Sequence, residues 1–99
     1  MYTFSHTDYE RIAEMVSEQI KSTSLTQLNI TLENDEESAD ITLKALVVPI
    51  VESEKLHHRT IKSLHGITPV WWEVTTTTLD GEVINDFDIK TLNEYLEQW

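Results

Sequence analysis

Three histidines and three cationic side chains gather in one stretch of this chain, and they are the first residues whose chemistry could serve a function. From Lys55 to Pro69 the sequence contains no acidic residue. The candidate binding residues in this stretch are His57, His58, Arg59, Lys62 and His65. They could recognise an anionic group or form a pH-sensitive contact through imidazole. A basic stretch more often lies against carboxylates of its own molecule than binds a ligand, because this contact lowers the repulsion among the negative charges of the domain.

The same histidines do not predict a metal site. Neighbouring residues of a regular strand point to opposite faces, so His57 and His58 cannot both reach one ion. The spacings that place two imidazoles on one helix face are absent, and so is cysteine. The acidic run from Asp35 to Asp40 lacks the alternating pattern and the distal glutamate of a calcium loop. We therefore expect no bound metal or other cofactor.

Motifs for catalysis are also absent. The sequence has no G-x-S-x-G elbow and no S-x-x-K. Two glycines are too few for a phosphate-binding loop or a dinucleotide fingerprint. Glu73 would serve as a general acid only if a second carboxylate lay beside it in a buried site, and the sequence pairs it with none. We expect no catalytic residue and predict that the protein is not an enzyme.

A pair of tryptophans provides another candidate contact. Trp71 and Trp72 lie in a predicted strand, so their rings point to opposite faces. Trp72 shares its face with Val70 and is predicted to lie in the core. Trp71 shares its face with Glu73, which indicates the solvent side, where an exposed indole could anchor a partner. Alternatively, the segment 52–66 covers Trp71.

The charge balance limits the possible partners. The chain carries 18 acidic and seven basic residues among 99, a formal charge of -11. Such a surface repels nucleic-acid phosphates and anionic lipid, so we expect neither nucleic-acid binding nor membrane binding. A basic protein or a neutral ligand would meet no such repulsion.

The compartment is predicted from what the chain lacks. Residues 1–8 contain neither the basic nor the apolar region of an export signal. No apolar run approaches the length that spans a bilayer. We therefore expect a cytoplasmic protein.

Two helices are predicted, one near each end. Apolar residues at helical spacing predict the first over about Asp8 to Lys21, with Thr7 and Glu10 as a capping box. The second begins at about Asp88, its predicted N-cap. Its apolar face consists of Ile89, Leu92, Leu96 and Trp99.

Between the helices the sequence predicts four or five strands. Alternation indicates strands over 27–32, 41–48 and 70–77, and a short strand over 82–86 after an Asp80-Gly81 hairpin turn. Pro49 lacks an amide donor and belongs at an edge or a bulge. Residues 52–66 fit no period, so we expect a turn at 52–54, a short edge strand near 56–60 and then a loop.

These elements predict one α+β domain over residues 1–99. Short connections favour a mainly antiparallel sheet. The apolar stripe of each helix is buried if both helices pack on one face of a curved sheet, which gives two layers in the order α-β-β-(β)-β-β-α.

The function predicted from these features is a non-enzymatic protein-interaction module. Its partner would be a basic protein, or a second copy bound through a strand edge or Trp71. An alternative is a small-ligand pocket between the layers, lined by Trp72, Tyr95 and Trp99. A minor alternative is an acidic mimic of nucleic acid that binds a basic protein.

Overall fold

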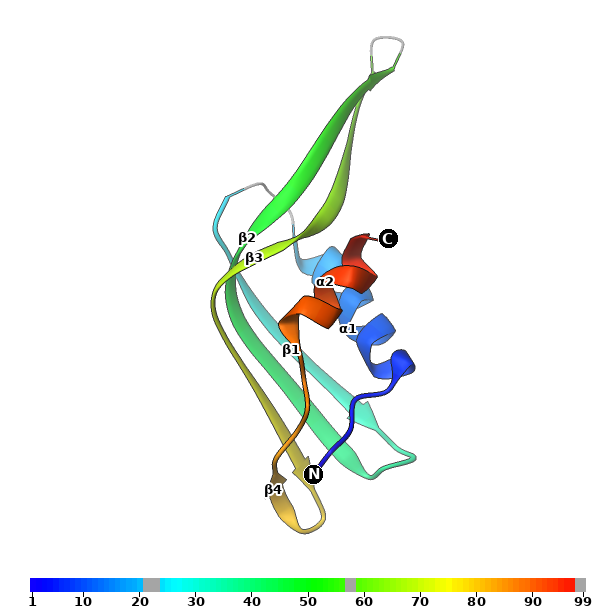
Figure 1. Ribbon diagram of the computed structural model, residues 1–99, viewed down its shortest axis with the longest axis vertical. Helices are drawn as coiled ribbons and strands as arrows, with labels where there is room; N and C mark the ends of the chain where they lie inside the picture. Colours follow the sequence, from blue (N-terminus) through cyan, green and yellow to red (C-terminus); the bar gives the residue numbers. More distant parts are fainter. Residues whose placement is uncertain (21–23, 57–58, 98–99) are drawn as a thin grey trace.

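The computed structural model describes residues 1–20, 24–56 and 59–97, with the backbone alone for 52–56 and 59–63. Its elements are α1 (His6–Gln19), β1 (Thr26–Asn34), β2 (Ala39–Leu56), β3 (Arg59–Thr78), β4 (Gly81–Val83) and α2 (Ile89–Glu97). The strands form one antiparallel sheet in the order β1-β2-β3-β4. Both helices lie on one face of this bowed sheet (Figure 1). The predicted two-layer α+β fold is confirmed.

Helix α1 begins two residues earlier than predicted. Its N-cap is Ser5, whose hydroxyl accepts from the Asp8 amide at 3.2 Å, while the Asp8 carboxylate accepts from the Ser5 amide at 3.1 Å. The predicted box of Thr7 and Glu10 is therefore wrong. Ser5 with Asp8 and Thr7 with Glu10 both have the spacing of a capping box. Only Asp8 also accepts hydrogen bonds from buried partners, the side chains of Tyr2 and Asn34. The helix ends at Gln19 rather than Lys21, which lies outside the described residues.

Helix α2 begins where the sequence predicts. The Asp88 carboxylate accepts from the amide of Lys90 at 2.9 Å, which is the N-cap bond. Leu92 and Leu96 are fully buried, and Ile89 is partly buried against the same core. Trp99 lies outside the described residues.

The core fills the space between the helices and the inner face of the sheet. Its fully buried members include Ile12 and Val16 of α1, Leu28 and Ile30 of β1, and Ile41, Leu43 and Val47 of β2. Burying one such side chain stabilises the fold by about 1.5–3 kcal/mol. This burial fixes the register of β1 and β2, because a slip of one residue would turn every apolar side chain outward.

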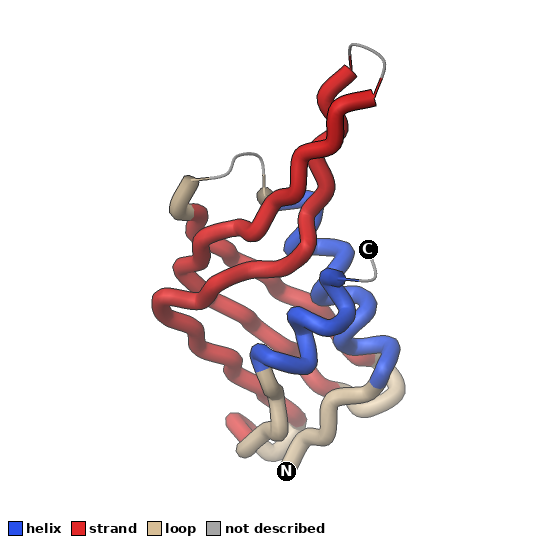
Figure 2. Tube along the Cα trace, turned by 45° about the horizontal axis from the view of Figure 1, so that its top comes forward, coloured by secondary structure: helices blue, strands red, loops and turns tan. Residues whose placement is uncertain are grey.

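Strands β2 and β3 continue far beyond the body as a two-stranded hairpin. They pair from Asp40↔Thr77 to Leu56↔Arg59, whereas β1 stops pairing at Val47. The predicted turn at 52–54, the short strand at 56–60 and the loop after it are therefore wrong. We call residues 52–56 and 59–63 the arm. Figure 2 shows it standing clear of both helices, and the molecule is 55 Å long.

Two β-bulges bend β3 at the base of the arm. The register shifts between Leu46 and Val47 and between Ile50 and Val51, which leaves Val70 and His65 as extra residues in β3. A bulge of this kind bends the strand and increases its twist. Pro49 lies between the two shifts and beyond the last β1 pair, an edge position as predicted.

Candidate interaction surface

The sheet face opposite the helices is exposed along its whole length. By register this open face presents Gln27, Asn29, Thr31, Glu33, Asp40, Thr42, Lys44, Leu46, Val48, Ile50, Thr68, Trp71, Glu73, Thr75, Thr77 and Glu82. Each of these side chains is exposed or only partly buried in the described structure. Nothing in the described part of the chain packs over this face as the helices pack over the other.

An apolar patch occupies the half of the open face nearer the arm. It consists of Leu46, Val48, Ile50 and Trp71, with Leu46 directly opposite Trp71 in the register. Val48, Ile50 and Trp71 are 38%, 50% and 51% exposed. A contiguous exposed apolar patch on a small domain typically marks an interaction site.

The two tryptophans divide between the faces, as alternation predicts. Trp71 lies on the open face, and among the described residues nothing covers it, since its side chain is about half exposed. The prediction that Trp72 belongs to the core is wrong, because it remains 39% exposed. Its ring meets Phe87 edge-on at 5.4 Å on the helix side. Strand β4 pairs only from Thr76 to Thr78, so no further strand covers the ring.

A hollow lies beside the apolar patch on the same face. Thr42, Lys44, Glu73 and Thr75 line it, and its volume is about 270 Å³. Lys44 and Glu73 are directly opposite in the register, so one positive and one negative side chain flank the hollow. The open face therefore carries an exposed indole and, two residues along β3, a hollow that is open to solvent.

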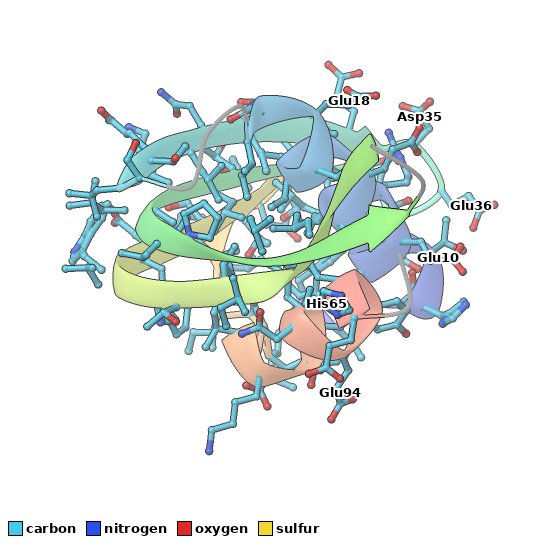
Figure 3. The ribbon with its side chains drawn as sticks, turned by 90° about the horizontal axis from the view of Figure 1, so that it is seen from above. Glu10, Glu18, Asp35, Glu36, His65 and Glu94 are labelled. Carbon is cyan, nitrogen blue, oxygen red and sulfur yellow. The ribbon has the colours of Figure 1, made fainter. Side chains whose placement is uncertain are left out.

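Charge is distributed unevenly between the two sides of the molecule. The half of the open face nearer the arm carries no charged side chain, and its middle carries only Lys44 and Glu73. Glu33, Asp40 and Glu82 lie at the far end. Figure 3 shows the carboxylates of Glu10, Glu18, Asp35 and Glu36 on the helix side and at the β1–β2 turn. The apolar patch thus lies on a part of the open face that carries no charged side chain among the described residues.

Side-chain amides close the sheet edges. Gln19 bonds both the carbonyl and the amide of Asn29 on β1, at 2.7 and 3.0 Å. Asn93 makes the same pair of bonds with Ile67 on β3, at 3.1 and 2.8 Å. Asn85 donates to the carbonyl of Val74 at 3.2 Å. These hydrogen bonds occupy backbone amide and carbonyl groups that would otherwise be available to pair with a strand from another chain.

The predicted basic residues are not gathered in one loop. Arg59 and Lys62 belong to the arm strand of β3, where the backbone alone is described. His65 is the extra residue of the second bulge and is partly buried. Figure 3 shows it over α2, the helix that carries Glu94. His57 and His58 lie outside the described residues, so their predicted role stays a prediction.

A hydrogen-bonded row of three side chains escaped the sequence analysis. Nε2 of His6 lies 2.6 Å from Oε1 of Glu10, and its Nδ1 lies 2.6 Å from the Tyr95 hydroxyl. His6 and Glu10 have helical i, i+4 spacing, but Tyr95 is 89 residues away and has no signal in the sequence. Because the side chains of His6 and Glu10 are 69% and 52% exposed, the row is open to water. Its structural effect is to join α1 to α2.

A buried carboxylate fixes the N-terminal segment. Asp8 is 2% exposed and accepts from the Tyr2 hydroxyl at 2.7 Å and from the Asn34 amide at 3.3 Å. Burial and the hydrogen bond to Asp8 raise the pKa of Tyr2 from 10.0 to about 12. This network joins the start of the chain to the end of β1, so its role is structural.

The rings predicted to line a ligand pocket have other partners. Tyr95 stacks on Tyr9 at 5.4 Å and 10°, while Trp72 meets Phe87. An open groove of about 550 Å³ runs past Trp72 and Phe87 to β4. Trp99 is outside the described residues, so the pocket between the layers stays a prediction.

Within the described residues, no group of three or more metal-binding side chains is close enough to hold an ion. None of the helices there has the length and apolar character needed to cross a membrane. Comparison of the chain with protein-family models, curated proteins and solved structures returns no match.

Proposed function

We propose that this protein is a protein-interaction module that binds its partner through the open face of the sheet. The observation that carries the proposal is the apolar patch around Trp71 on a face that no described element covers. Aromatic residues at the centre of an interface supply most of its binding free energy. A chain this acidic places its exposed indole where charge is lowest, so a partner can approach without losing the hydration of many carboxylates.

The edges of the sheet are less suitable for binding. A partner strand could not pair at Asn29 or Ile67 without displacing the amide of Gln19 or Asn93. Each displacement would break two hydrogen bonds before new ones form. Docking on the face requires no such loss.

Photo-crosslinking from two positions tests the proposal. A photoreactive side chain replaces Val48 on the open face or, as the matched control, Glu14 on the exposed helix side. In cells that produce the protein we expect adducts from position 48 and none from position 14, whatever the partner is. Adducts from position 14 alone would overturn the proposal and favour binding through the acidic helix side.

A further inference from the structure

The open face has a feature that identifies a partner. Trp71 lies on the open face with half of its surface exposed, and the hollow lined by Thr42, Lys44, Glu73 and Thr75 begins two residues away along β3. The hollow has a volume of about 270 Å³ and is open to solvent on its outer side, so a side chain from a second molecule can reach it. Because Trp71 and the hollow belong to the same face, the surface is complementary to itself.

We infer that the partner is a second copy of this chain, bound through a two-fold contact in which each Trp71 enters the hollow of the other copy. The inference rests on the proposed function of the open face. In a two-fold interface, residue i of one subunit meets residue j of the other, and j meets i. A projecting side chain and its hollow on one surface satisfy this condition, and the axis then passes between Trp71 and the hollow.

The charges near the contact support the same partner. Lys44 and Glu73 flank the hollow, so a two-fold arrangement can place Lys44 of each copy near Glu73 of the other. The Lys44 ammonium can also lie against the indole that enters the hollow, a favourable cation–π contact. A strongly basic partner would instead be drawn to the acidic helix side, where Figure 3 shows Glu10 and Glu18.

The shape of the sheet limits the contact to its middle. The helices lie on the concave side of the bowed sheet (Figure 1), so the open side is convex. The bulge at Val70, next to Trp71, adds to the curvature of β3 there. A convex surface meets its copy over a small area, so we expect a weak, concentration-dependent dimer of the size class below about 1,200 Å².

Salt distinguishes this dimer from a contact made by opposite charges. Two copies of charge -11 repel each other, and salt screens that repulsion. The dimer should therefore strengthen as salt is raised. A dimer that dissociates with added salt would overturn the assignment to the open face and indicate pairing of the basic residues of the arm with the acidic helix side.

Sedimentation equilibrium of the purified full chain tests the inference. We expect a monomer–dimer equilibrium between about 5 and 500 µM protein. Trp71→Ala removes the projecting ring and should raise the dissociation constant at least about 30-fold. Thr75→Phe fills the hollow and should do the same. Trp72→Ala and Leu79→Ala are the controls, since each removes an exposed apolar side chain elsewhere and should leave the dimer intact.

Mixing the two variants gives the sharpest outcome. A heterodimer of the Trp71→Ala and Thr75→Phe chains keeps one intact indole and one open hollow facing each other. It should therefore form in the mixture at concentrations where each variant alone is monomeric. A mixture that stays monomeric, or a wild-type mass that stays at 11.5 kDa throughout, would overturn the inference. If the dimer does not form but position 48 still crosslinks to another protein, the inference of a dimer is wrong and the proposed function of the open face is retained.

Discussion

The side-chain amide of Gln19 takes the place of a neighbouring strand for Asn29. Its Nε2 donates to the Asn29 carbonyl at 2.7 Å, and its Oε1 accepts from the Asn29 amide at 3.0 Å. One residue at the end of α1 thus satisfies both backbone groups in the middle of the outer edge of β1. A strand from another chain could pair with Asn29 only after displacing this side chain.

Replacing Gln19 tests this protection. Gln19→Ala should lower the free energy of unfolding by about 1 kcal/mol, because two partly exposed hydrogen bonds are lost. The amide of Asn29 should also exchange with solvent deuterium faster, while amides of β2 keep their rates. Gln27→Ala, on the exposed face of the same strand, is the matched control and should change neither quantity. Equal exchange rates at Asn29 in the wild-type and Gln19→Ala proteins would show that the edge is closed by other means.

The buried tyrosine at the start of the chain predicts a loss of stability in alkali. The pKa of Tyr2 is about 12 in the folded protein, against 10.0 when unperturbed, so the folded state holds this proton more tightly. Its contribution to stability is complete below pH 10.0 and is lost as the pH rises toward 12. Urea unfolding of wild type and Tyr2→Phe at pH 8 to 11.5 measures the effect, with the two proteins converging at the highest pH. A constant difference in stability across this range would exclude the linkage.

Gly66 and Asn93 form a coupled pair. Gly66 has a φ of +157°, and a Cβ there would lie 3.0 Å from the Asn93 Oδ1 that holds Ile67. Gly66→Ala should therefore destabilise the fold by about 1–3 kcal/mol. Asn93→Ala should cost a similar amount, since it leaves both backbone groups of Ile67 without this partner. The double variant should be less destabilised than the sum of the single effects, and strict additivity would contradict the contact.

The alternating strands and the hairpin between β3 and β4 could be predicted from the sequence. Leu28 and Ile30 alternate with polar residues and lie in the core. The predicted hairpin forms, but its turn lies one residue earlier, at Leu79 and Asp80, and Gly81, at a φ of +100°, pairs with Thr78 as the first residue of β4. These features succeed because a single local rule, burial of one face or a positive φ, determines each of them.

Other features depend on contacts that are distant in sequence. Ser5 and Thr7 are equally good caps locally, and the choice follows from Tyr2 and Asn34 binding Asp8. Trp72 lies on the predicted face, but its exposure depends on the length of β4. The backbone of the arm stands clear of the helices that impose alternation on the rest of the sheet, and its sequence shows no period of two. The hollow beside Trp71 is formed by two strands and has no linear signature.

Removing the arm tests whether the partner binds the open face or the basic residues of the arm. Residues 52–63 are replaced by Asn-Gly, which joins Val51 to its register partner Leu64. A two-stranded hairpin is marginally stable by itself, so the free energy of unfolding should change by less than about 1 kcal/mol. Crosslinks from position 48 should persist. Their loss in the folded, shortened protein would assign binding to the basic residues of the arm, Arg59 and Lys62 among them.

Quenching of Trp71 fluorescence measures the central claim most directly. With Trp72 and Trp99 replaced by phenylalanine, Trp71 is the sole tryptophan, and acrylamide reports its access to solvent. The quenching constant should be high in dilute solution and fall severalfold as protein concentration or salt is raised. A Trp71 that stays fully quenchable while the protein associates would contradict the assignment of binding to the open face.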